Sequence, residues 1–345
     1  MKINEKAQEL IKKLMIENPN TILTIGYLYK GKKSFKLFDA IGEIPYKSHA
    51  YEIASISKVF TTSLLAKYLH EGKMSLDDSV AKYIPELEED KYYPTLRRLA
   101  THTAGYKTEA LTNWEIAKVL FKAIQTRILK KPSGYFDAFG KVDYEKLIWF
   151  TEKNKLEDRD YEWGYSDYSV ALLGEAVCQA AGTPYPKLMA EFLKHDLGLT
   201  NTKTIVDRPD MLDGYLYNHH VGTMKLYRSD DYAAPAGGLT STAQDLLEFA
   251  QMNIEENPKF LGLTHECFPT NQQGFDMGLG WWIWNEGDNA KNPPFGHTGG
   301  SEGFSTSLTF IKERETAVVI LTNAGSYSPS EISNEIFRGN WEEEI

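Results

Sequence analysis

Segments rich in β-forming residues lie near both ends of the chain, and helical patterns fill the region between them. Residues 21–29 and 34–40 flank a turn and predict a hairpin. Later strands are predicted over residues 280–284, 304–311 and 316–322. Both sets can pair in one antiparallel sheet flanked by helices. Such segregation is typical of an α+β fold with an all-helical lobe rather than of alternating βαβ units.

Apolar residues at helical spacing predict a helix over residues 10–15 and many more through the centre of the chain. The strongest stripe covers residues 59–69 and stops before Gly72, because glycine favours helix ends. Other helices are predicted over residues 76–87, 95–101, 107–160 with a break at 131–134, 168–194, 242–252 and 329–337. We expect one domain. Its sheet lobe would comprise about residues 1–50 and 235–345, and its helical lobe about residues 55–230.

The chain has 48 acidic and 38 basic residues, which give a formal net charge of −10. This total disfavours nucleic acid and anionic lipid as partners, because both are negatively charged. No stretch approaches the ~20 apolar residues of a membrane-spanning helix. Residues 1–16 carry charges throughout and lack the apolar core of a secretory signal. We therefore expect a cytoplasmic protein, unless a leader has been removed.

Neither cysteines nor histidines form a metal-binding pattern. Cys178 and Cys267 lie far apart and belong to no Cys-x-x-Cys pair, so we expect neither a disulfide framework nor a thiolate zinc site. The eight histidines include no His-Glu-x-x-His motif. We expect no metal, and the sequence gives no indication of oligomeric state.

The pattern Ser-x-x-Lys occurs at Ser55/Lys58 and again at Ser79/Lys82, so the motif alone is weak. Ser79 lies in a short polar segment and is interpreted as structural. Ser55 lies at the start of the strongest apolar helix, where free N–H groups and the helix dipole suit a developing oxyanion. Three residues of helix place Lys58 on the same face. The alternative is an N-capping serine followed by a surface lysine.

A rival nucleophile is Ser301, within Gly-Gly-Ser-Glu-Gly at 299–303. A nucleophile elbow needs a helix after the serine and a histidine later in the chain. Here a strand-like run follows, and the last histidine, His297, precedes the serine. Both features argue against an α/β-hydrolase.

Three separated segments occur in the order Ser55-Ile56-Ser57-Lys58, Tyr165-Ser166-Asp167 and His297-Thr298-Gly299. In this order they resemble the three motifs of the serine β-lactamase and penicillin-binding protein superfamily, in its class C-like branch. Residues 71–85, 99–105 and 236–242 are similar to connecting segments of that family. The resemblance runs from about residue 20 to the end of the chain and implies a β-lactamase/transpeptidase-like fold.

The resemblance also implies roles for these residues. Ser55 would attack a carbonyl, and Lys58 and Tyr165 would transfer its proton. The backbone N–H groups of Ser55 and Gly300 would form the oxyanion hole. His297, Thr298 and Gly299 would line an edge strand at the substrate. No metal or organic cofactor is implied.

One residue departs from the pattern, since Asp167 stands where the family usually has asparagine. An asparagine amide can donate and accept, whereas an ionised carboxylate only accepts. We expect Asp167 to pair with Lys58, keep it charged and shift the role of base towards Tyr165. Alternatively, Asp167 is a neutral variant held by local hydrogen bonds.

The leading hypothesis is a serine hydrolase that acts through an acyl-enzyme. Its substrate would be a small ester, a D-amino-acid peptide or a related amide. The alternative is a catalytically weak or inactive penicillin-recognising binding or sensor protein on the same fold. Under both, the partner is a small molecule or short peptide, and residues 107–160 form either a lid or plain scaffold.

Overall fold

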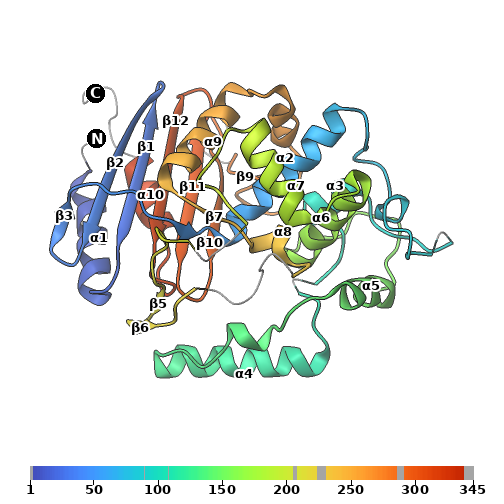
Figure 1. The fold of residues 1–345 in the computed structure, drawn as a ribbon, viewed down its shortest axis with the longest axis horizontal. Helices are drawn as coiled ribbons and strands as arrows, with labels where there is room; N and C mark the ends of the chain where they lie inside the picture. Colours follow the sequence, from blue (N-terminus) through green and yellow to red (C-terminus); the bar gives the residue numbers. More distant parts are fainter. Residues whose placement is uncertain are drawn as a thin grey trace.

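The computed structural model describes residues 3–88, 90–107, 109–204, 208–223, 231–285 and 291–337. Within these residues one antiparallel sheet has eight strands, in the order β3-β2-β1-β12-β11-β10-β9-β8 (Figure 1). The first and last long strands are thus neighbours at its centre, which confirms the predicted α+β class. The strands are β1 (Leu23–Tyr29), β2 (Lys32–Asp39), β3 (Gly42–Ile44), β8 (Asp276–Met277), β9 (Trp282–Ile283), β10 (Phe295–Gly300), β11 (Ser305–Ile311) and β12 (Thr316–Thr322).

Helices cover both faces of the sheet. Because strand side chains alternate, β12 buries Val318 and Ile320 on one face and Val319 and Leu321 on the other. The first face packs against α1 (Glu5–Glu17) and α10 (Ser330–Phe337), and the second against α9 (Ala243–Glu255). Gly26 of β1 permits the close approach of Leu247 on α9, whose side chain a Cβ at Gly26 would meet at 3.2 Å.

The helical part lies beside the sheet, with α2 (Ser57–His70) at its centre (Figure 1). Eleven of the fourteen α2 residues are buried, so α2 is enclosed rather than amphipathic. It packs most closely against the 3₁₀ segment Lys259–His265, and next against α6 (Asp167–Ala181) and the short α8 (Ala234–Gly237). The remaining helices of this part are α3 (Leu96–Ala100), α4 (Asn113–Leu129), α5 (Tyr144–Lys153), α6 (Asp167–Ala181), α7 (Tyr185–Glu191) and α8 (Ala234–Gly237). Two further strand pairs are β4 (Tyr51–Glu52) with β7 (Thr240–Ser241) and β5 (Tyr215–Leu216) with β6 (His219–His220).

Two helix predictions are wrong in detail. Residues 76–87 form turns around a 3₁₀ segment, Val80–Lys82, because the side chains of Asp78 and Ser79 accept bonds from nearby backbone N–H groups. Residues 168–194 form two helices, α6 and α7. Gly182 ends α6 in the left-handed conformation, with φ of 61°, and Pro184 precedes α7.

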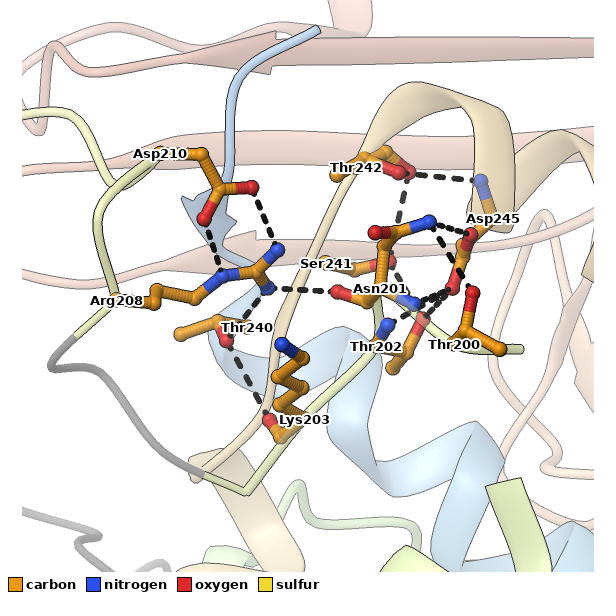
Figure 2. Close-up of polar contacts among 10 residues, drawn as sticks. All are labelled: Thr200, Asn201, Thr202, Lys203, Arg208, Asp210, Thr240, Ser241, Thr242 and Asp245. Atoms are coloured by element: carbon orange, nitrogen blue, oxygen red, sulfur yellow. Dashed lines mark hydrogen bonds and ion pairs between the residues drawn. The ribbon is translucent and has the colours of Figure 1, made fainter. Parts of the chain in front are cut away.

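A largely buried polar cluster joins residues 200–203 and Arg208 to β7 and to the start of α9 (Figure 2). The Asp245 carboxylate accepts from the backbone N–H groups of Asn201 and Thr202, at 2.8 Å each, and from the Thr202 hydroxyl at 3.0 Å. Arg208 binds Asp210 through two nitrogens and also donates to the Asn201 carbonyl at 2.6 Å. One carboxylate thus satisfies several donors that burial removes from water.

We expect Asp245→Ala to lower the free energy of unfolding by about 2–4 kcal/mol, since it leaves buried backbone donors without acceptors. Denaturant unfolding followed by circular dichroism measures this difference. The neighbouring Gln244→Ala replaces an exposed side chain and serves as the control. Equal stability of the two variants would show that the cluster contributes little.

Candidate active site

Ser55 lies in a 3₁₀ turn, η1 (Ala54–Ile56), that leads directly into α2. The preceding residue, Ala54, has φ of 43°, a left-handed conformation that is unfavourable for a residue with a Cβ. Ser55 itself is only partly buried. Such strain is retained when the surrounding structure imposes it, and it is concentrated at functional sites.

The ammonium group of Lys58 lies at the centre of the candidate site. Its side chain is fully buried, and Nζ donates to Ser55 Oγ at 3.1 Å and to the Ala236 carbonyl at 2.7 Å. It forms an ion pair with Asp167, at the first turn of α6, and lies 4.9 Å from the centre of the Tyr165 ring. Residues from three separate segments therefore surround one buried cation.

Tyr165 and Asp167 reach the site through the turn that begins α6. Ser166 caps this helix, with its hydroxyl accepting from the Ser169 N–H at 3.0 Å. The Tyr165 hydroxyl is hydrogen-bonded to both Lys58 and Ser55. Tyr165 and Asp167 are the residues on either side of this cap, and both contact the Ser55–Lys58 pair.

The protonation states follow from burial and from these contacts. Burial alone would lower the pKa of Lys58, but Asp167 and Tyr165 outweigh it and raise the pKa to about 12. Burial raises the pKa of Tyr165 to about 12, although the Lys58 charge acts in the opposite direction. Burial would raise the pKa of Asp167, but the Lys58 charge lowers it below its ordinary value. At neutral pH the site holds a lysine cation, an aspartate and a neutral tyrosine.

Glu109 also hydrogen-bonds to Asp167, a contact that the sequence motifs did not indicate. Asp167 therefore contacts both the Lys58 cation and a side chain from the segment that leads into α4.

Strand β10 passes beside the turn that carries Ser55. Gly299 lies against the chain just before Ser55, where a Cβ would come within 2.1 Å of the Ile53 carbonyl oxygen. Thr298 and Gly300 are exposed, whereas His297 and Gly299 are buried, as alternation along a strand requires. Strand β9 pairs with β10 only at Phe295 and Gly296, so the Thr298–Gly300 end extends beyond that pairing.

His297 is buried against the tyrosine rather than exposed with Thr298. Its ring centre lies 6.2 Å from that of Tyr165, and Nδ1 lies 2.6 Å from the Thr298 carbonyl oxygen. Burial, helped by the Lys58 charge, lowers the pKa of His297 to about 3. The imidazole is therefore neutral at physiological pH.

A second histidine, His102, also packs near the tyrosine ring and carries no role in the sequence-based assignment. Its ring centre is 4.8 Å from that of Tyr165, and Nδ1 accepts from the Ser166 N–H at 3.2 Å. Burial lowers its pKa to about 3. Its segment, residues 99–105, resembles a connecting segment of the family, and this is the sequence signal that could have indicated it.

The two rival serines have structural contacts. Ser79 caps its 3₁₀ turn through the Ala81 N–H, and its hydroxyl donates to the Tyr93 carbonyl at 3.1 Å. Ser301 is buried and donates to the Glu52 carboxylate at 2.6 Å. Within the described part of the chain, neither of these hydroxyl groups bonds to a lysine ammonium or to a tyrosine hydroxyl.

Comparison with known proteins agrees with this architecture. A relative from Dictyostelium discoideum, named Beta-lactamase-like protein 2, is 26% identical over 85% of this chain, which spans about half (52%) of that relative's length. The class C β-lactamase structure from Rhodobacter sphaeroides has a TM-score of 0.77 at 18% identity and covers 97% of this chain and 99% of its own. The β-lactamase/D-alanine carboxypeptidase structure from Pseudomonas syringae has a TM-score of 0.75 at 22% identity, with 96% of both chains covered.

These structures share the fold of this chain, in which a large antiparallel sheet lies beside a group of helices. The model of the family described as Beta-lactamase matches residues 28–339, which is most of the chain. The matched range includes all three motifs that meet around Lys58. The protein is therefore a member of the Beta-lactamase family.

Proposed function

We propose that this protein is a serine hydrolase. The substrate acylates Ser55, and water then removes the acyl group. The observation that carries the proposal is the meeting of Ser55, Lys58 and Tyr165 around one buried ammonium group. The Pseudomonas syringae protein of similar fold is named as a β-lactamase and a D-alanine carboxypeptidase, and both names denote the cleavage of amides. The substrate class is a small ester, a D-amino-acid peptide or a related amide.

In the acylation step Ser55 Oγ forms a bond to the substrate carbonyl carbon, and its proton passes to the oxygen of ionised Tyr165. Lys58 stabilises that phenolate as a neighbouring cation. The leaving alcohol or amine departs with the proton from Tyr165. Water then attacks the acyl group, and the same transfers in reverse restore Ser55.

Charge on the carbonyl oxygen needs hydrogen-bond donors in the transition state. We assign this role to the N–H groups of Ser55, in its 3₁₀ turn, and of exposed Gly300. The contact between Gly299 and the Ile53 carbonyl supports the assignment, because it places the end of β10 beside the nucleophile turn. Exposed Thr298 would contact the substrate along the same edge, and the buried His297 would position Tyr165.

A second candidate function has one specific observation in its favour. Asp167 holds Lys58 as a cation, and the high pKa of Tyr165 keeps its ionised form rare at neutral pH. Both effects oppose acylation. The protein would then bind its ligand, acylate once or not at all, and act as a sensor.

Ser55→Ala is expected to abolish labelling by a fluorophosphonate probe, because removal of the nucleophile leaves no acyl acceptor. Intact-mass spectrometry measures the adduct. Ser79→Ala and Ser301→Ala are the matched controls and should label normally. Labelling that persists in Ser55→Ala would contradict the assignment. Product release beyond one equivalent with an ester would favour the hydrolase over the sensor.

The pH dependence of kcat/KM should report the Lys58–Tyr165 pair. Since both pKa values are about 12, kcat/KM for a simple ester should rise from about pH 6 to about pH 10 without a plateau. Asp167→Asn removes a negative charge that raises both pKa values, so the rising limb should move to lower pH. A pKa that is lower by one gives about a tenfold higher kcat/KM at any fixed pH on the rising limb. Rates measured with Ser55→Ala provide the background. If the rising limb of the pH profile lies at the same pH in Asp167→Asn as in the unmodified protein, this explanation is wrong.

Asp167 should also affect substrate preference. The carboxylate repels an acylamino carbonyl placed beside it, and a hydrogen bond left unmade costs about 1–3 kcal/mol. Penicillins and peptides would therefore lose roughly tenfold to a hundredfold in rate relative to esters. Asp167→Asn should narrow the ratio of kcat/KM between an ester and a penicillin. An unchanged ratio would identify Asp167 as a neutral variant.

A further inference from the structure

Helix α4 contacts the rest of the protein on one side only. Figure 1 shows it as a bar at the margin of the molecule, below the ends of the strands. Among its residues, all of which are described, only Val119 and Thr126 are buried. Its closest packing partner is the short 3₁₀ segment Phe136–Ala138. The opposite side of the helix is open.

Large apolar residues occupy this open side. Trp114, Phe121 and Ile128 are 79%, 62% and 72% exposed, and they recur every seventh residue. Leu120 and Ile124, each 57% exposed, lie on the same face because residues three or four apart are neighbours on a helix. We call these five residues the α4 stripe. The buried Val119 and Thr126 lie on the opposite side of the helix, so the α4 stripe faces away from the rest of the protein.

The charges around the α4 stripe are opposite in sign to those of the whole chain. Residues 113–131 contain five basic residues and one acidic residue, a net charge of +4, whereas the whole chain has −10. Glu115, the one acid, is paired with Lys146 at 3.0 Å. Lys118, Arg127 and Lys131 are exposed and make no ion pair with any described residue. In helical projection Lys118 and Arg127 flank the stripe on its two sides.

An apolar stripe flanked by basic residues on a peripheral helix is the pattern of a helix that lies in a membrane interface. We propose that α4 docks this protein on an anionic lipid surface, with the α4 stripe among the acyl chains and the basic residues at the headgroups. The net charge of the whole chain disfavours anionic lipid as a partner. Charges farther than about 10 Å from the lipid are screened, however, so the local net charge of +4 governs binding at α4. No described helix is long and apolar enough to cross a bilayer, and this proposal needs none.

A second copy of the chain fits the α4 stripe less well. Two α4 helices packed stripe to stripe would bring Lys118 and Arg127 of one copy against the same basic side chains of the other. Like charges across an interface oppose pairing. Negative lipid headgroups instead complement each of these residues.

Docking through α4 would bring the candidate active site to the lipid surface. Glu109, four residues before α4, hydrogen-bonds to Asp167. Tyr135, which follows α4, is also close enough for Asp167 and Glu109 to raise its pKa, after the larger effect of burial. The segment before α4 therefore contacts the site through Glu109, and the segment after it lies on the same side of the body. The docking proposal does not depend on which reaction occurs there.

Vesicle flotation tests the proposal with the whole chain. Vesicles of phosphatidylcholine with roughly one quarter phosphatidylglycerol should carry the protein, and vesicles of phosphatidylcholine alone should carry at least about tenfold less. Phe121→Ser with Ile128→Ser should lower binding at least about tenfold. Lys118→Gln with Arg127→Gln should lower it about tenfold and weaken its salt dependence. Ile16→Ser with Ile41→Ser is the matched control, because these residues are exposed elsewhere, and it should bind normally.

Circular dichroism melting verifies that each variant is folded, as substitutions of exposed side chains predict. The proposal is overturned if the unmodified protein does not float with either vesicle, or if the control pair loses binding as much as the α4 pair. Light scattering adds one decisive outcome. A dimer that Phe121→Ser with Ile128→Ser converts to a monomer, without vesicle binding by either, would assign the α4 stripe to self-association.

Discussion

The buried ammonium of Lys58 is the interaction on which the rest of the site depends. A lysine without solvent exposure is stable as a cation only when acceptors surround it. Here they come from η1, from the start of α6 and from the Ala236 carbonyl in α8. Removing one partner would leave a buried charge uncompensated, which costs about 3–5 kcal/mol. The same contacts that hold these segments together also fix the protonation states on which the proposed acylation of Ser55 depends.

Strand β10 provides the second constraint, since it must lie close to the turn that carries Ser55. A residue larger than glycine at 299 would collide with the Ile53 carbonyl. The hydrogen bond between Glu52 and Ser301 joins the same two segments, the chain before Ser55 and the end of β10. The site is thus formed where the sheet meets the helical part, and its geometry depends on packing across that junction rather than on any single loop.

Sequence patterns predicted the sheet, most helices and the residues that meet at Lys58, because alternation and helical periodicity are local and the motifs are distinctive. They did not predict the turns at 76–87, where Asp78 and Ser79 bind the backbone. Glu109 and His102 were also missed as neighbours of Asp167 and Tyr165. Those contacts depend on how distant segments pack, which local patterns do not contain. The sequence indicates α4 only as part of a helical region, because a periodicity shows which residues share a face and not which way that face points.

The pairing of β1 with β12 has a consequence for the order of folding. Every residue of β1 from Leu23 to Tyr29 is matched with a residue between Thr316 and Thr322. During synthesis, the hairpin of β1 and β2 therefore has an open edge until residues 316–322 have emerged from the ribosome. Contacts of such long sequence separation form slowly, and open strand edges are prone to aggregation. The nascent chain is most vulnerable at its amino-terminal hairpin, and a chaperone that covers this edge would protect the protein before its last strands are made.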